Sequence, residues 1–573
     1  MTKKTLILAI AAAFSFATAA QAQVPPSVLQ NQNRIQQEQQ RLLNEEFRRQ
    51  ELQNALKRPK PKETPKQAAE EEPDLVGSCV NIRKILFTGN SKVSDWSIKR
   101  ITKQYKDTCM SLPQINQMLN KITDLYIEKG YITSRAYMTM PQKRLKRGIL
   151  EIKIVEGKLS KVEGLELGQV VTAFPFMIGS VLNLRDIEQG IDQLNRLPSN
   201  SATMDIKPDD KNEYSKLKVK NEPKGTTRLT FFTDNAGSES TGETRFGMRA
   251  AQDNLLGLNE QINMSYANSP SKDYDHRDAN YLTVGASIPF GYWTLNNNFS
   301  WSDYRTSFLL YNGDRFYSYG NSVTNSLSLD RLLARGQRYK ISASGGLTYK
   351  RNQNYTKVLD LKMQNEVSSR DLAIVNLGLS STFYFDNGVL YLNPTYNKGT
   401  KWFGALNDNH NNYTQEAQYE AWKLYAYGSV NLFNVATYTA TFDGQYSQDE
   451  LYGTEAFYLG GEYSVRGFRN EGVQGDSGYA FRNDLDFNLG ALAKSDNEIL
   501  QGINFGPFID YGYVHSNNED IKSEILSGAG GKVSLKYKFF DASVGYATVL
   551  KKPKWIDENE AVYLYAGFNF SFN

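Results

Sequence analysis

From about Arg228 to Asn573, apolar side chains occupy every second position of successive short segments. A period of two is typical of a β-strand whose two faces meet different surroundings. In the closing segment, one face carries Val562, Leu564, Ala566, Phe568, Phe570 and Phe572, and the other carries Tyr563, Tyr565, Gly567, Asn569 and Ser571. This pattern predicts strands that separate an apolar environment from a polar one.

The alternation recurs over residues 293–301, 339–349 and 533–539. In the last segment, the face opposite Val533 and Leu535 carries Lys532, Ser534, Lys536 and Lys538. An apolar, aromatic face opposite a charged one, with Asn, Asp and Gly turns between segments, is typical of a transmembrane β-barrel. Because an open edge would leave unpaired backbone groups in lipid, the sheet must close. A soluble secreted β-protein is the alternative interpretation.

The start of the chain indicates export. Lys3 and Lys4 precede an apolar stretch that ends in small residues at Ala22, which predicts a cleavable signal peptide over residues 1–22. The stretch is too short for a stable membrane span. An exported chain with 12% aromatic residues, a mean hydropathy of −0.53 and strand periodicity is expected in a bacterial outer membrane.

Composition excludes several classes of function. A net charge of +4 is too small to indicate a nucleic-acid partner, and three histidines with two cysteines are too few for most metal sites. We therefore expect neither a metal nor a cofactor. In the periplasm, Cys79 and Cys109 are expected to form a structural disulfide worth about 3–4 kcal/mol. A reactive thiol pair is the alternative, which their wide spacing disfavours.

Residues 26–57 are rich in Gln, Arg and Glu, with only a thin apolar stripe, and predict a long helix. Such a helix suits a polar barrel lumen as a plug; a solvated helix or a disordered tail remains the alternative. Residues 58–78 form a linker of prolines and charged residues. Its Pro-rich part can extend to roughly 50 Å, which exceeds the roughly 25 Å apolar height of a barrel. The helix can therefore lie inside the barrel while the following domain stays in the periplasm.

Two small α+β units are predicted between the linker and the barrel, over residues 79–157 and 158–225. In the first, we expect one strand over residues 80–87, two helices capped by Ser94 and Ser111, and strands over 131–138 and 149–155. In the second, we expect strands over 159–165, 202–206 and 214–219, a short connection through Phe174 and Pro175, and a helix capped by Asn183.

Four strings carry a resemblance to a known family. Two lie in the second unit, at residues 183–198 and 202–206, and two lie in the barrel: Val465-Arg466-Gly467-Phe468 and Phe508-Ile509-Asp510-Tyr511-Gly512. In this order they resemble the outer-membrane transporters of two-partner secretion, the TpsB family of haemolysin, adhesin and contact-dependent inhibition exporters. The resemblance implies two POTRA domains (79–157 and 158–225) and a barrel of about sixteen strands (226–573).

The resemblance also implies a function. Such a transporter recognises a large exoprotein, its TpsA-type cargo, in the periplasm through its POTRA domains and secretes it unfolded through the barrel. We expect a monomer whose partners are this cargo and outer-membrane lipid. An outer-membrane assembly factor of the same superfamily and a gated porin are the alternatives.

The two barrel strings predict a contact between a loop and the barrel wall. Alternation along residues 503–513 turns Phe508, Asp510 and Gly512 inward. Arg466 lies in a glycine-rich connection that can fold back into the lumen, and its guanidinium can grip a carboxylate through two parallel hydrogen bonds. The family implies the same pair, so we predict a lock built from Val465, Arg466, Gly467, Phe468, Phe508, Asp510 and Gly512. The alternative is a solvated Arg466, with Asp510 paired to Lys532.

One string resembles a catalytic motif. Gly475-Asp476-Ser477-Gly478 is similar to the nucleophile loop of chymotrypsin-like proteases, and the chain contains His276, His410 and His515. However, Tyr479 stands where that motif carries another glycine, and no carboxylate-oriented histidine is apparent. We therefore do not expect an enzyme.

Overall fold

The computed structural model describes residues 26–56, 79–139, 142–270, 277–309, 315–358, 361–364, 369–408, 414–518 and 522–573. The expected signal peptide (1–22) and the whole of the expected linker (58–78) lie outside these ranges, as do His276 and His410. Within the described ranges, no helix is both long enough and apolar enough to cross a membrane.

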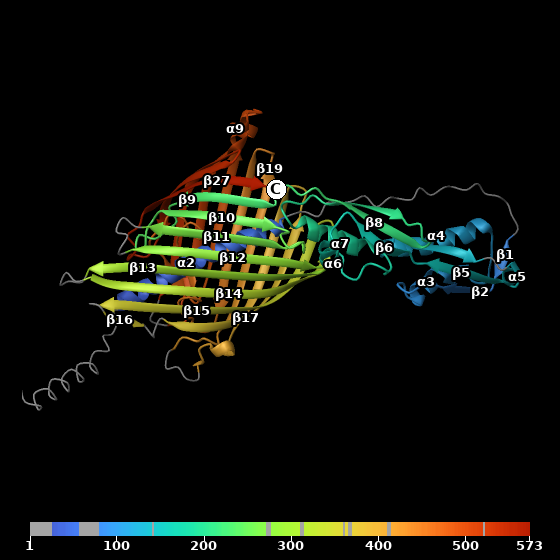
Figure 1. Ribbon diagram of the computed structural model, residues 1–573, viewed down its shortest axis with the longest axis horizontal. Helices are drawn as coiled ribbons and strands as arrows, with labels where there is room; N and C mark the ends of the chain where they lie inside the picture. Colours follow the sequence, from blue (N-terminus) through green and yellow to red (C-terminus); the bar gives the residue numbers. More distant parts are fainter. Residues whose placement is uncertain are drawn as a thin grey trace, which may run out of the picture.

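Sixteen antiparallel strands form a closed barrel, which is closed by pairing of the last strand with the first (Figure 1). In chain order they are β9 (Thr227–Asp234), β10 (Arg245–Asp253), β11 (Gln261–Pro270), β12 (Asp278–Phe290), β13 (Trp293–Leu309), β14 (Arg315–Arg335), β15 (Tyr339–Val358), β17 (Arg370–Tyr384), β18 (Gly388–Thr400), β19 (Glu420–Leu432), β20 (Ala436–Ser447), β23 (Ser477–Asn488), β24 (Ile503–His515), β25 (Glu524–Tyr537), β26 (Phe540–Lys551) and β27 (Glu560–Phe572). The short β16 (Leu361–Gln364) pairs with the far end of β15.

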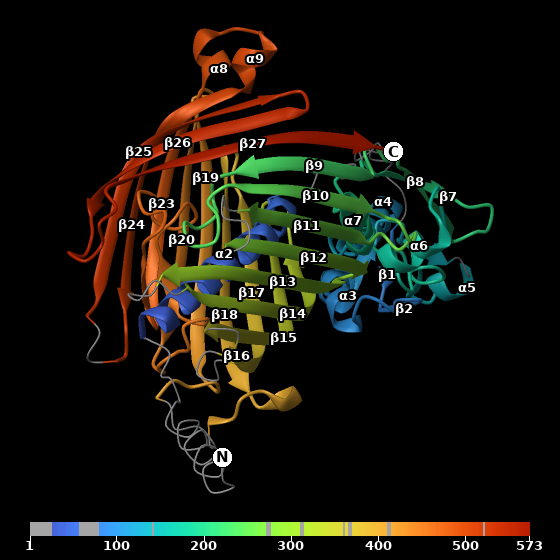
Figure 2. The same cartoon turned by 60° about the vertical axis from the view of Figure 1, so that its left-hand side comes forward.

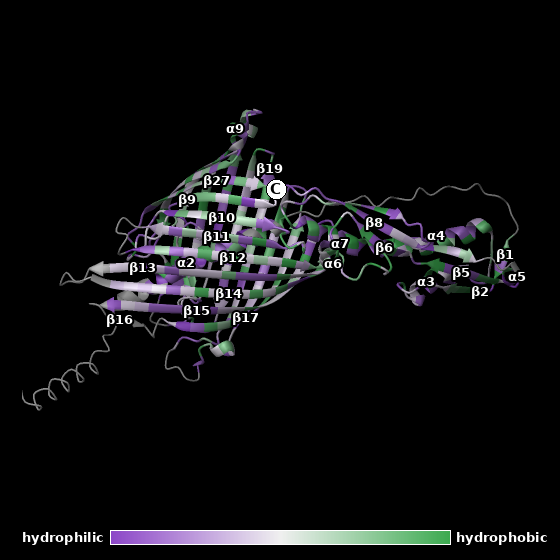
Figure 3. Cartoon of the chain, viewed as in Figure 1, coloured by the Kyte–Doolittle hydropathy of each residue, from purple (hydrophilic) through white to green (hydrophobic). Residues whose placement is uncertain are grey.

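The predicted alternation is confirmed on the barrel wall. Figure 3 shows hydrophobic and hydrophilic residues alternating along the strands. In β27, Leu564 and Phe568 are exposed on the outer face, whereas Tyr563 is buried inside. Short elements connect some strands: η2 (Trp402–Gly404) follows β18, and α8 (Leu489–Ala493) and α9 (Glu498–Gly502) lie between β23 and β24.

The first small domain contains β1 (Val80–Ile82), β2 (Lys84–Thr88), α3 (Asp95–Thr102), η1 (Lys103–Tyr105), β3 (Thr108–Met110), α4 (Leu112–Glu128), β4 (Arg135–Thr139), α5 (Gln142–Leu145) and β5 (Ile149–Val155). Ser94 and Ser111 cap α3 and α4 as expected. The single strand expected over 80–87 is wrong. The backbone changes partners at Arg83, so that β1 pairs with β3 while β2 pairs in parallel with β5. The strand expected from Tyr131 begins only at Arg135, because Ser134 N–H closes a turn on the Tyr131 carbonyl.

The second small domain contains β6 (Lys158–Glu163), α6 (Leu167–Ala173), α7 (Leu184–Asn195), β7 (Thr203–Pro208) and β8 (Tyr214–Lys220). Its sheet has the order β6-β8-β7, which leaves β7 at an edge. Asn183 caps α7 as expected, because its side chain accepts the Arg185 N–H at 2.8 Å. The segment expected to be a short connection through Phe174 also contains a helix that the sequence did not predict: α6, which begins with a capping box between Glu166 and Gln169.

A disulfide joins Cys79 to Cys109. It fastens the residue before β1 to β3, whose ladder with β1 is only three residue pairs long. We expect replacement of both cysteines by serine to destabilise this domain by about 3–4 kcal/mol, because the unfolded chain loses a constraint on a loop of 30 residues. Limited proteolysis of the intact protein will then cut within residues 79–157 faster than in the unreduced wild type, and reduced wild type will match the variant. Detection of two free thiols in unreduced protein would contradict the prediction.

Candidate functional site

The connection between β20 and β23 folds back into the barrel, and we call residues 448–476 the inner loop. Its own short strands, β21 (Phe457–Leu459) and β22 (Val473–Gly475), pair with each other. Arg466 lies between them and is buried against the wall. Its Nε and Nη2 donate to the two carboxylate oxygens of Asp510 at 2.6 and 2.7 Å, and its backbone N–H donates to the same carboxylate at 3.0 Å.

A second carboxylate completes the arginine site. Nη1 and Nη2 of Arg466 donate to Asp484 on β23 at 2.7 and 3.2 Å. The guanidinium carbon also lies 3.6 Å from the centre of the Phe508 ring, in cation–π geometry. One buried cation thus contacts two anions and an aromatic face, which satisfies the condition that a buried charge be fully partnered.

Two glycines let the inner loop approach the wall. A Cβ at Gly512 would lie 2.8 Å from Leu459 and 3.0 Å from Val465, and one at Gly528 would lie 1.9 Å from the Arg466 carbonyl oxygen. The string from Phe508 to Gly512 therefore has a physical basis: an aromatic face for the cation, a carboxylate that binds it, and space for the loop.

The residues on either side of Arg466 in the chain are held in place by apolar packing. Val465 and Phe468 are fully buried in a cluster shared by the loop and the wall, which also contains Leu459, Val473, Ala480, Val514, Leu526 and Ile556. Between them, Gly467 adopts a φ of 111°, and its N–H donates to the Tyr563 hydroxyl at 3.0 Å. Beyond them, the Glu558 carboxylate accepts the three backbone N–H groups of residues 469–471.

The structure brings together all seven residues named for the lock. The alternative pairing of Asp510 with Lys532 is wrong, because the Lys532 ammonium contacts Asp484 and Asp486, each at 3.1 Å. Sequence reasoning missed Asp484. Asp484 lies opposite Phe508 in the pairing of β23 with β24, and the sequence pattern of either strand alone does not show this pairing.

The side chain of Ser477 binds the protein backbone rather than a histidine. Its hydroxyl donates to the Ser447 carbonyl and accepts the Ser447 N–H, both at 3.0 Å. The neighbouring Asp476 carboxylate accepts the backbone N–H groups of Leu451 and Asn517 at 2.7 Å. The string at 475–478 thus ties the ends of the inner loop to the wall.

The N-terminal helix α2 (Pro26–Ala55) lies inside the ring of strands (Figure 2). Its Ile35 and Leu43 are buried against wall residues that include Phe232, Tyr281 and Tyr304. Polar side chains reach five strands: Gln32 donates to Ser318 (2.6 Å), Gln36 to Asn354 (2.9 Å), Gln39 to the Asp303 carbonyl (3.1 Å), Arg48 to Asp443 (2.8 Å), and Glu46 accepts from Arg249 (2.9 Å). The Gln-rich composition therefore matches a polar lumen.

The same helix contacts the inner loop. Arg34 Nη1 donates to the Asn470 carbonyl at 2.8 Å, and Arg41 donates to the Gly460 carbonyl. The Arg41 guanidinium also lies over the Tyr458 ring. Helix, loop and wall are thus in mutual contact.

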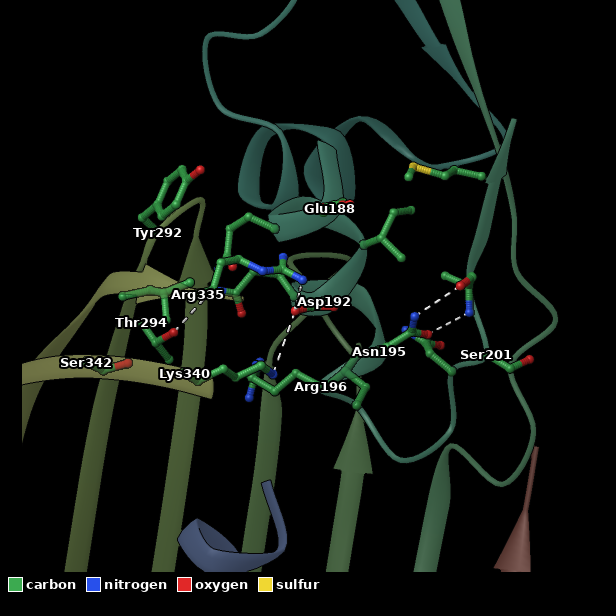
Figure 4. A pocket seen from close by; sticks show the side chains of 18 of the residues that line it. Glu188, Asp192, Asn195, Arg196, Ser201, Tyr292, Thr294, Arg335, Lys340 and Ser342 are labelled. Carbon is green, nitrogen blue, oxygen red and sulfur yellow. Dashed lines mark hydrogen bonds and ion pairs between the residues drawn. The ribbon is translucent and has the colours of Figure 1, made fainter. Parts of the chain in front are cut away.

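At the other end, the second small domain meets the barrel rim around a cavity of about 540 Å³ (Figure 4). It is lined by α7, by Thr203 and Met204 of β7, and by the ends of β13, β14 and β15. Asp192 of α7 pairs with Arg335 at 3.0 Å and with Lys340 at 3.6 Å. A second cavity, of about 630 Å³, lies beside α2 in the lumen and shares Arg196, Thr294, Asp330, Lys340 and Ser342 with the first.

Comparison with known proteins identifies this architecture. Residues 213–535 match the family model "Haemolysin secretion/activation protein ShlB/FhaC/HecB". The chain belongs to the ShlB/FhaC/HecB family. Models of POTRA domains match residues 80–157 and 157–208.

Relatives of this family align over most of the chain. The outer membrane transporter CdiB of Dickeya dadantii (strain 3937) is 34% identical over 87% of this chain and 88% of its own length. The hemolysin transporter protein ShlB of Serratia marcescens is 32% identical over 72% of this chain and 73% of its own length. The solved structure of CdiB from Escherichia coli has a TM-score of 0.78 and 31% identity, covering 94% of this chain and 98% of that one.

As a ShlB/FhaC/HecB family member, the protein is an outer-membrane transporter of two-partner secretion, with its POTRA domains in the periplasm. The family is one of secretion channels. The rim cavity between α7 and the barrel therefore lies at the periplasmic entrance, and the two small domains are the first and second POTRA domains.

Proposed function

We propose that this transporter takes a large exoprotein in extended form at the rim cavity and passes it, without covalent chemistry, through the barrel. The observation that carries this proposal is the pair of adjoining cavities, which share lining residues from the α7–β7 groove to the lumen. They mark one route from the periplasm to the space beside α2.

The edge strand β7 offers a place where an extended segment of the exoprotein can bind. An extended segment can add to an exposed sheet edge through backbone hydrogen bonds, which accept many sequences. Thr203 and Met204 of β7 line the cavity, so that a bound segment would start at the entrance. This mode suits a cargo that is recognised before it folds.

Passage requires α2 to leave the lumen, because the helix contacts strands on opposite parts of the wall. Two of these contacts are ion pairs and the third is a neutral hydrogen bond. Each contributes only about 0.5–3 kcal/mol net, because water replaces it when the helix leaves. The protein works as a monomer, and folding of the cargo outside the cell drives export, because the periplasm offers no nucleotide.

A photo-crosslinking amino acid at Thr203 tests this route. In cells that also express the large exoprotein that the transporter secretes, we expect a crosslinked adduct of transporter and exoprotein. The control places the same amino acid at Lys161 on β6, the opposite edge of the same sheet. Adducts at Lys161 without any at Thr203 would overturn the proposed route.

A further inference from the structure

Helix α6 of the second POTRA domain presents an apolar face to its surroundings. Leu167 and Val171, one helical turn apart, are 79% and 48% exposed, and the following turn exposes Phe176 (88%) and Ile178 (54%). A soluble domain normally turns such residues inward. A group of large exposed apolar side chains marks a binding surface or a membrane contact. We call these four residues the α6 face.

The opposite side of α6 is fixed to the barrel rim. The Gly291 N–H donates to the Thr172 carbonyl at 2.8 Å, and Asn259 Nδ2 donates to the Gln169 carbonyl at 3.0 Å. A Cβ at Gly168 would lie 2.4 Å from the Gly257 carbonyl oxygen, so the helix packs closely on the rim. Figure 1 shows α6 at the end of the barrel, beside the end of β12. The direction of the α6 face is therefore set by the barrel itself.

The α6 face continues the lipid-facing surface of the barrel. The ring of Phe176 meets that of Phe290 edge to face, with 5.9 Å between centroids. Phe290 pairs with Trp293 across β12 and β13, and both side chains are exposed on the outer face. Arg331 lies 4.9 Å from the Trp293 ring centre, as expected where an aromatic girdle meets lipid headgroups.

Three further features support this continuity. The turn between β10 and β11, which packs on α6, exposes Leu255 and Leu256. Phe176 has a φ of 59°, in the left-handed region that a bulky side chain rarely adopts. This backbone turn directs the ring toward Phe290. A cleft of about 500 Å³ next to it is lined by both apolar rings and Arg331, which suits an amphiphilic molecule.

We propose that the α6 face inserts into the periplasmic leaflet of the outer membrane and that its partner is phospholipid. The barrel rim places the face beside the lipid belt, and its side chains match the acyl-chain boundary. The contact anchors the second POTRA domain, so that the groove between α7 and β7 stays over the barrel entrance. This role is additional to cargo transport and requires no cargo.

Single cysteines test the proposal, because both native cysteines are held in the disulfide. Leu167→Cys and Ile178→Cys are labelled with the fluorophore NBD, and the intact protein is placed in nanodiscs of phosphatidylethanolamine and phosphatidylglycerol. We expect blue-shifted emission that brominated acyl chains quench. The control is Trp96→Cys in the first POTRA domain, which is also exposed and should show neither effect.

Emission at 167 and 178 that matches the Trp96 control would overturn the proposal. A blue shift that bromine does not quench but that grows with protein density would also overturn it, by indicating contact with a second copy. In a Val171→Asp/Phe176→Asp variant, the label at 178 should lose its shift while the barrel keeps its heat-modifiable migration. Because these measurements use no cargo, their failure is distinct from failure of the proposed transport route.

Discussion

We expect Asp510→Ala to abolish secretion while the barrel remains closed. The substitution removes the two hydrogen bonds that this carboxylate accepts from the buried guanidinium of Arg466 and the one that it accepts from the Arg466 backbone N–H. Breaking a buried ion pair by removing one partner costs about 3–5 kcal/mol, and Asp484 compensates only part of the guanidinium charge because it also pairs with Lys532. The inner loop can escape that cost by leaving the wall, which exposes its apolar cluster and disorders the lumen. Secretion is measured as exoprotein in the medium, and barrel closure as heat-modifiable migration.

A double-mutant cycle separates the lock from general damage. Arg466→Ala should impair secretion as strongly as Asp510→Ala, and the double variant should be little worse, because coupled residues are not additive. Lys532→Ala is the matched control: it removes another inward cation that contacts Asp484 but not Asp510, and we expect a small effect. Additive losses, or an equal loss from Lys532→Ala, would refute the lock.

The wall side of this site could be predicted from sequence because a strand has a fixed period. Once Ile509 and Tyr511 are assigned to lipid, Phe508 and Asp510 must face inward, and the structure agrees. Asp484 could not be found in this way. Its position opposite Phe508 depends on the register between β23 and β24, which local alternation does not determine.

The errors in the small domains have a related cause. The split of the first strand at Arg83 follows from which partner strands are available, and these lie far away in sequence. Helix α6 was missed because its outward face carries Leu167 and Val171, so that it lacks the polar face of an ordinary surface helix. For α2, the sequence predicted a helix with a thin apolar stripe, but only the lumen geometry shows that Ile35 and Leu43 are buried against the wall.

Deletion of residues 26–56 should raise the single-channel conductance of the barrel several-fold in planar bilayers. The helix fills the lumen between β10, β15 and β20, and its removal opens an aqueous path bordered by polar side chains. As a control, Gln36→Ala/Arg48→Ala keeps the helix but removes two wall contacts, and we expect it to show more frequent openings rather than a permanently open channel. Unchanged conductance after the deletion would contradict the plug.

Holding α2 in place should block secretion. Gln36 and Asn354 lie side by side, with 2.9 Å between Nε2 and Oδ1, so cysteines at both positions can be joined by a short cleavable bifunctional reagent. We expect the joined protein to keep low conductance and to stop secreting, and cleavage of the reagent to restore both. The two single-cysteine variants, treated with the same reagent and cleavage conditions, control for modification and for reduction of the native disulfide. Undiminished secretion by the joined protein would show that cargo passes without release of the helix.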